Sequence, residues 1–293
     1  MEFLSYLISG ISLGSIYAII ALGYTMVYGI AKMLNFAHGD IIMIGGYVSF
    51  CSMYYLNLPP IVATLLAVIA CTVLGIVIER LAYAPLRSAP SLAVLITAIG
   101  VSYFLQNSAL LIWKAAAKTY PPVVAGAVQL FNGQLTISYI SLLTIAACVV
   151  IMLALTWFTG RTKMGKAMRA CSEDKGAAQL MGINVNGTIS LTFAIGSGLA
   201  AIAGVLLCSA YPTLVPTTGA MPGIKAFTAA VFGGIGSIPG AVIGAFIIGI
   251  CESFIKANET IAVFSNAFTF ALLIVILLCK PNGLFGEKLT EKV

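Results

Sequence analysis

Few side chains in this 293-residue sequence could carry out chemistry. A single histidine, His38, lies two residues before Asp40, so a His-based metal cluster or a Ser-His-Asp set would depend on it alone. Neither H-E-x-x-H nor the phosphate-binding G-x-x-x-x-G-K-[ST] motif occurs. We therefore expect no catalytic residues, no metal and no cofactor in this chain. Any ATP that drives it would bind, with Mg, to another protein.

The most polar short segment between two early apolar runs is Asn35–Asp40. It can be a turn, with Asn35 as a cap and Asp40 at the start of a helix, where the dipole favours a carboxylate. It can instead line or gate a translocation pathway, because polar groups at membrane depth are costly and usually face a cavity or a partner. The residues predicted for that pathway or gate here are Asn35, Phe36, His38, Gly39 and Asp40.

Lys225 is a lone cation within apolar sequence and has two interpretations. Its ammonium can extend to the outer membrane interface. Alternatively, it lies at the outer mouth of a pathway and meets a carboxylate or a substrate-delivery protein. Glu252, Lys256 and Glu259 are expected only to flank a helix end. The glycine- and proline-rich break between Lys225 and Glu252 adds three residues to the predicted pathway or gate: Gly236, Pro239 and Gly240.

A polar, basic insert, Arg161–Val185, interrupts the apolar sequence. Ser172 can cap a short helix that starts with Glu173 and Asp174 and stops at Gly182. Gly165–Cys171 can form a second short helix. Because helices of this length are marginal alone in water, the insert needs a surface to lie on. Packing on its own bundle is one possibility, but docking on a cytoplasmic partner is the stronger expectation.

The elements around these residues are membrane-spanning helices. The chain is 60% hydrophobic and only 8% charged, and its charge-free runs are long enough to cross a bilayer without the alternation of a barrel. We predict an all-α polytopic membrane protein, a single domain over residues 1–293 with about eight to nine transmembrane segments, some broken at Gly or Pro. The positive charge is concentrated in a few loops and the tail, so we do not interpret it as a nucleic-acid signal. Because cytoplasmic loops carry an excess of Lys and Arg, the basic loops and the tail are expected in the cytoplasm. The charge-free runs are Phe3–Ala31, Ile41–Ile78, Ser91–Trp113, Ile137–Gly160, Gly176–Ile224, Ala226–Cys251 and Thr260–Cys279.

Two local patterns refine this layout. If Gly233–Gly240 punctuates one span, the tail lies outside. If it separates two crossings, or a short and a long helix, the tail lies inside, and this choice gives about nine crossings with the N-terminus outside. Asn132-Gly133 between two apolar stretches predicts a small hairpin in an outer loop. Small residues recur every four positions at Gly10 and Gly14, at Gly196, Ala200 and Gly204, and at Gly236, Gly240 and Gly244, which favours close helix packing in lipid.

Four strings together resemble the LivH-type permease of branched-chain amino acid ABC importers, and the resemblance runs nearly end to end. Asp40 stands where that family often has glutamate, which keeps the charge. The strings are GSIYAIIALG at 14–23, NFAHGD at 35–40, RACSED at 169–174 with LMGIN at 180–184, and GIKAFTAAVFGGIGSIPG at 223–240.

The resemblance implies a multi-pass subunit in the inner or plasma membrane of a prokaryote. Its partners would be a second related permease, two cytoplasmic ATPases that carry the ATP and Mg, and an extracytoplasmic substrate-binding protein. Residues 161–187 would be the cytoplasmic coupling loop. The coupling residues that this implies are Gly165, Arg169, Ala170, Glu173, Asp174, Ala177, Ala178, Leu180 and Gly182.

Several functions stay open at this stage. We expect import of the branched-chain amino acids Leu, Ile and Val, with urea, short amides or other amino acids as the alternative for the same architecture. An ion-coupled carrier would need ionisable groups at mid-membrane or paired broken helices. A membrane-embedded transferase or hydrolase would need acids or histidines clustered at an interface, and here only His38 and Asp40 lie near each other.

Overall fold

The computed structural model describes residues 2–87, 89–130, 135–280 and 282–286. The long apolar runs form helices, because a helix satisfies its own backbone polar groups where no water is available. Among the described residues, six helices are long and apolar enough to cross a membrane. The prediction of an all-α polytopic protein is confirmed at this level. The six are α1 (Glu2–Ala31), α3 (Pro60–Ile78, continued by the short helices η1, Glu79–Tyr83, and η2, Ala84–Leu86), α4 (Ser91–Trp113), α5 (Tyr139–Arg161), α8 (Val185–Ala210) and α10 (Ile238–Lys256).

Shorter elements complete the bundle. Three of the shorter helices are also mostly apolar: α2 (His38–Tyr54), α9 (Ala220–Gly233) and α12 (Ser265–Cys279). The others lie in connections between the long helices, and four short strands form two small antiparallel pairs. These remaining elements are α6 (Lys163–Glu173), α7 (Lys175–Leu180), α11 (Glu259–Ala262), β1 (Lys118–Thr119), β2 (Ala127–Leu130), β3 (Leu135–Ser138) and β4 (Thr213–Leu214).

Helices α1 and α8 are the most buried of the long helices and form the centre of the bundle, whereas α3, α4 and α5 are the least buried and lie at its edge. In the most apolar stretch of α8, 83% of the residues are buried, whereas the value for α4 is 17%. α1 packs along α10, α8, α9 and α5, so it contacts most of the structure. The edge helices present large apolar side chains outward, as expected where the surrounding solvent is hydrocarbon.

The chain re-enters the bundle between α1 and α2. After Ala31, Lys32 adopts a positive φ of 56°, and residues 32–37 lead back to His38 at the start of α2. The His38 ring lies 4.5 Å from the Tyr24 ring, well inside α1. α2 therefore begins in the interior of the bundle, not at its end.

α9 begins against the start of α2. A Cβ on Gly39 would lie 2.8 Å from the carbonyl oxygen of Gly219, and one on Gly223 would lie 2.9 Å from the Cα of Gly39. Only glycine lets the two backbones approach this closely. Two shorter helices thus start beside each other within the bundle.

The turn between α9 and α10 separates two helices. Gly234 and Gly236 have φ values of 105° and 101°, which other residues rarely adopt. Ser237 then caps α10, accepting a hydrogen bond from the Gly240 backbone N–H at 3.2 Å. The segment therefore separates a short helix, α9, from a longer one, α10, as one of the two alternatives requires.

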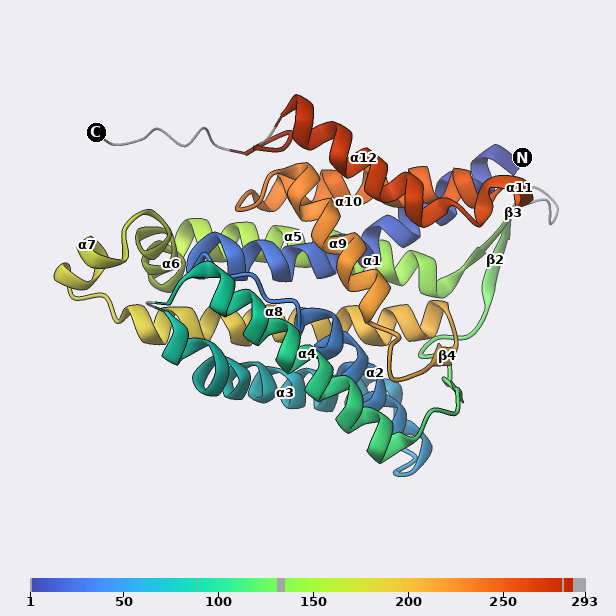
Figure 1. The fold of residues 1–293 in the computed structure, drawn as a ribbon. Helices are drawn as coiled ribbons and strands as arrows, with labels where there is room; N and C mark the ends of the chain where they lie inside the picture. The colour runs from blue at the N-terminus through green and yellow to red at the C-terminus, as the bar shows by residue number, and fades with distance from the viewer. Residues whose placement is uncertain (1, 88, 131–134, 281, 287–293) are drawn as a thin grey trace.

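The predicted outer hairpin has its two strands. β2 pairs with β3 in antiparallel register from Ala127–Ser138 to Leu130–Leu135, while its turn, Asn132-Gly133, lies outside the described residues. β1 pairs with β4. In Figure 1 the β2–β3 hairpin lies at the same end of the molecule as the N-terminus, opposite α6 and α7.

The small-residue patterns mark helix contacts. Gly10 and Gly14 lie against the α10 backbone near Ile250 and Phe246. Gly204 lies against Ile42 of α2, and Gly244 against Ala229 of α9. Gly236 contributes to the turn, and its Cα lies 3.3 Å from the position of a Cβ on Gly29 of α1.

The Gly39–Gly219 contact gives a stability prediction. Gly219→Ala should destabilise the protein by about 1–3 kcal/mol, because the new methyl group overlaps the Gly39 carbonyl. The measurement is thermal unfolding of the purified protein in detergent. Gly100→Ala is the control, since a Cβ there meets nothing within 4 Å. Equal unfolding temperatures for the two variants would contradict the contact.

Candidate functional site

Two short helices, α6 and α7, form the basic insert at one end of the bundle. Thr162 caps α6 by accepting a hydrogen bond from the Gly165 N–H at 3.0 Å. Asp174 caps α7 by accepting from the N–H groups of Gly176 and Ala177 at 2.8 and 3.0 Å. The predicted cap, Ser172, is wrong: it lies inside α6 and donates to the Arg169 carbonyl. A carboxylate accepts two bonds here, whereas the Ser172 hydroxyl returns to its own helix.

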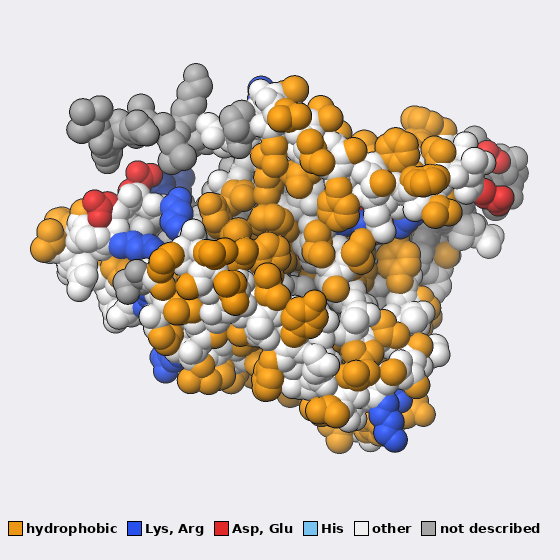
Figure 2. Space-filling view, in the orientation of Figure 1, with side chains coloured by type: hydrophobic (Ala, Val, Ile, Leu, Met, Phe, Trp, Pro, Cys, Tyr) orange, Lys and Arg blue, Asp and Glu red, His pale blue; other side chains and the backbone are white. Residues whose placement is uncertain are grey.

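α7 ends as predicted and presents apolar side chains outward. Gly182, with φ of 80°, follows the helix and terminates it. Leu180 and Met181 are 90% and 82% exposed. Figure 2 shows Lys and Arg side chains gathered around this end and apolar side chains across the middle of the molecule. Two adjacent apolar side chains are thus exposed at the end of the molecule that lies beyond the apolar middle.

The structure divides the predicted coupling residues between two sides of the insert. Gly165 and Ala178 are buried, and Ala170 is half-buried, so these three pack on the bundle. A Cβ on Gly165 would overlap the backbone of Phe158 and Thr159, which explains why α6 can cross the end of α5 so closely. The exposed members are Arg169, Glu173, Asp174, Ala177, Leu180 and Gly182.

Lys175 connects this insert to the central helix. Its ammonium donates to the Ala31 carbonyl at 2.8 Å, a favourable position for a cation at the end of α1. Partial burial, Arg87 and Lys32 lower the pKa of Lys175 from its usual value. The start of α7 is thus held against the last residue of α1.

A second connection was not predicted from the sequence. The Glu79 carboxylate is buried and accepts hydrogen bonds from Arg87 and, at 2.6 Å, from the Ser190 hydroxyl. Arg87 also donates to Asn186. This network joins the end of α3 to the first turns of α8, directly after the insert. The one sequence feature that could have indicated this network is Glu79, a charged residue directly after an apolar run.

The Asn35–Asp40 segment lies inside the bundle and is bonded to other helices. Asn35 accepts a hydrogen bond from the Tyr83 hydroxyl at 2.9 Å, so its side chain does not cap α2. Asp40 lies in the first turn of α2, as the turn interpretation predicts, and accepts from Gln106 at 2.8 Å. Phe36 and His38 contact Phe227 and Tyr24. The segment fixes the re-entrant chain against α1, α4 and α9.

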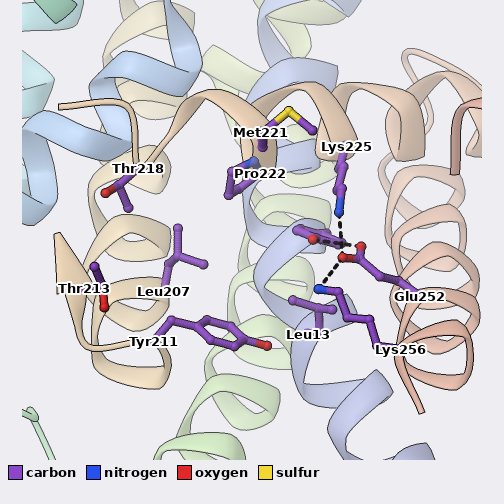
Figure 3. Close-up of a pocket in the computed structure, with 11 residues that line it drawn as sticks. Leu13, Leu207, Tyr211, Thr213, Thr218, Met221, Pro222, Lys225, Glu252 and Lys256 are labelled. Carbon is purple, nitrogen blue, oxygen red and sulfur yellow. Dashed lines mark hydrogen bonds and ion pairs between the residues drawn. The ribbon is translucent and has the colours of Figure 1, made fainter. Parts of the chain in front are cut away.

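A cavity of about 250 Å³ opens among α1, α8, α9 and α10, and ionic groups line one side of it (Figure 3). The Glu252 carboxylate accepts hydrogen bonds from Lys225 and Lys256, both at 2.6 Å, and from the Tyr17 hydroxyl at 3.0 Å. The Glu252 side chain is fully buried and that of Lys225 is 6% exposed, whereas that of Lys256 is 49% exposed. The eleven lining residues are Leu13, Tyr17, Leu207, Tyr211, Thr213, Thr218, Met221, Pro222, Lys225, Glu252 and Lys256.

This cavity corrects two expectations. Lys225 does not extend to the membrane interface, because its ammonium is paired with Glu252 within the bundle. Lys256 and Glu259 do flank helix ends as expected, at the end of α10 and the start of α11, but Glu252 and Lys256 also pair within the ionic cluster, which was not expected. Lys225 is the one predicted pathway residue among those that line the cavity. Gly236, Pro239 and Gly240 lie at the other end of α10, and the Asn35–Asp40 segment, which contacts α1, α4 and α9, does not line this cavity.

The chain is a bundle of membrane-length helices with a cavity that three ionic side chains line on one side, and comparison with known proteins shows that this bundle is a membrane transport component. The family described as branched-chain amino acid transport system, permease component, matches residues 6–277. The chain belongs to this family. It is 43% identical to the permease protein BraD of Pseudomonas aeruginosa and 45% identical to LivH of Escherichia coli K12, both named high-affinity branched-chain amino acid transport system permease proteins. Each alignment covers 100% of this chain and 98% of the relative.

A solved structure supports the fold alone. The chain resembles one chain of "PsaBC from Streptococcus pneumoniae in complex with Fab", with a TM-score of 0.51 and 16% identity. The match covers 97% of this chain and 94% of that chain. The arrangement of helices is therefore shared with a protein of very different sequence.

Loss of Glu252 should be costly unless Lys225 is removed with it. Glu252→Leu leaves a buried ammonium without its partner, and we expect a loss of roughly 3–5 kcal/mol of stability. The double variant Lys225→Met with Glu252→Leu should recover most of that loss, because both buried charges are then gone. Thermal unfolding in detergent measures both, with Glu259→Gln, an exposed site, as control. An unchanged unfolding temperature for Glu252→Leu would contradict the buried pairing.

Proposed function

We propose that this chain is the membrane permease subunit of an ATP-driven importer that moves branched-chain amino acids into the cytoplasm. It would act with a second related permease, two cytoplasmic ATPases and an extracytoplasmic binding protein. ATP and Mg would bind to the ATPases. The observation that carries the proposal is the helix α7, whose exposed Leu180 and Met181 lie at the basic end of a permease of this family.

The substrate class rests on the relatives. BraD and LivH, similar over their full length, are named for branched-chain amino acid transport. Import of leucine, isoleucine and valine is therefore the transport activity to test first.

The contacts of the insert support a coupling role. Movement of a docked α7 would act on α1 through the Lys175–Ala31 bond, and on α5 through the close contact at Gly165. α8 begins directly after the insert and is joined to α3 by the Glu79–Arg87 network. Since α1 and α8 both line the cavity, a change at α7 can alter the equilibrium between two states of the pathway.

The arrangement of the helices supports nine crossings with the N-terminus outside. α2 with the re-entrant segment, α9 with β4, and α12 would each complete a crossing in addition to the six long helices. The N-terminus and the α6–α7 end lie at opposite ends of the molecule in Figure 1. The described C-terminal residues contact the end of α9, because the Leu284 N–H donates a hydrogen bond to the Phe232 carbonyl. With the basic insert in the cytoplasm, the described C-terminal end is also cytoplasmic.

Leu180→Asp should uncouple the importer. Burying a leucine at an interface contributes about 1.5–3 kcal/mol, so its replacement should weaken ATPase binding by roughly tenfold or more. Co-purification of the ATPases and leucine uptake both measure this effect. Leu56→Asp, which changes another exposed leucine in the α2–α3 connection, is the control for membrane insertion. Wild-type uptake by Leu180→Asp would contradict docking through α7.

Cysteine labelling should place the two ends of the chain on opposite sides of the membrane. In a background without the seven native cysteines, Phe3→Cys should react with an impermeant maleimide in intact cells lacking an outer barrier. Gln179→Cys and Phe285→Cys should react only after permeabilisation. All three positions are exposed, but Phe3 lies at one end of the molecule and the other two lie at the opposite end. Reaction of Phe3→Cys and Phe285→Cys from the same side would exclude an odd number of crossings.

A further inference from the structure

The charges in the cavity do not cancel. Lys225 and Lys256 each carry one positive charge, and Glu252 carries one negative charge, so the cluster has a net charge of +1. Glu252 already accepts hydrogen bonds from both lysines and from Tyr17. The carboxylate therefore has its partners, and the excess charge belongs to the lysines.

Each lysine retains donors for a ligand. An ammonium has three N–H donors, and the described contacts use one from each lysine on Glu252. Charges within a membrane protein are expensive and are stabilised by opposite charge. A net positive site beside a cavity is therefore complementary to an anionic group.

The rest of the cavity defines what that group is attached to. Leu13, Leu207 and Met221 supply an apolar wall, and the Tyr211 hydroxyl, which points toward the ionic cluster in Figure 3, can accept a hydrogen bond from an ammonium. The volume of about 250 Å³ corresponds to about eight waters at ~30 Å³ each. That volume suits a single small zwitterion.

We infer that the cavity lined by Lys225, Lys256 and Glu252 is a transient binding site for the substrate amino acid, with its α-carboxylate between the two lysines and its aliphatic side chain against Leu207 and Met221. Glu252 is a positioning residue that holds the two ammonium groups beside the cavity. This inference rests on the proposed function, because it takes amino acids as the substrate.

Photochemical labelling of the assembled transporter tests the site directly. The probe is a leucine analogue whose side chain carries a diazirine, added to the complex in lipid nanodiscs without the binding protein. Labelling should fall on the peptides that carry Leu207 or Met221. Leucine should compete at least tenfold better than leucinol, which keeps the ammonium and side chain but lacks the carboxylate. A charge-assisted hydrogen bond contributes about 1.5–3 kcal/mol, which corresponds to roughly 10- to 100-fold.

Lys256→Gln separates binding from structure. Lys225 and Tyr17 still hold Glu252 in this variant, so we expect normal assembly, at least tenfold lower labelling, and loss of the preference for leucine over leucinol. Lys114→Gln removes an exposed charge from the end of α4 and should behave as wild type. A purely structural role would lower competition by leucine and leucinol equally. Labelling elsewhere, or wild-type discrimination in Lys256→Gln, overturns the inference.

Uptake by the wild-type complex with its binding protein distinguishes a failure of the proposed function from a failure of the proposed site. Failure to import any branched-chain amino acid would refute the proposed function. Import of leucine without carboxylate-dependent labelling of this cavity would refute only the site.

Discussion

The absence of water in the hydrocarbon layer is the constraint on which the rest of this structure depends. Every backbone polar group there needs a partner within the protein, and helices gain stability from close packing instead of hydrophobicity. The chain nevertheless stops and restarts helices inside the bundle, at His38 and at Ala220. It can do so because Gly39, Gly219 and Gly223 bring the two starts together, with other helices covering them. The helix starts inside the bundle therefore depend on the glycine contacts that bring them together.

The long helices could be predicted from the sequence, and the shorter ones only partly. Charge-free runs correspond closely to α1, α4 and α5, because length and composition alone determine a span. The start of α2 within the bundle depends on contacts with Tyr24 and Gly219 that are distant along the chain. The break between α9 and α10 was visible as glycine and proline. Whether it divided one helix or two depended on the φ values of Gly234 and Gly236.

The candidate sites show the same division between local and distant information. The basic insert and its end at Gly182 follow from local chemistry. The exposed face does not: Ala178 turns inward while Leu180 turns outward, because the start of α7 is fixed by Lys175 on Ala31. Lys225 and Glu252 each resemble an interfacial charge when read separately. Their pairing across 27 positions appears only when α9 and α10 lie side by side.

The pairing of Lys225 with Glu252 also bears on how the protein enters the membrane. A charged residue at the centre of a single helix costs about 2.5–3.5 kcal/mol on insertion scales, and α9 with 14 residues is short to insert alone. The tight turn after Gly233 joins α9 to α10, whose carboxylate neutralises the lysine of α9. Entry as a hairpin avoids the cost of two separate charges in lipid. The ion pair that lines the cavity therefore also lowers the cost of placing α9 and α10 together in lipid.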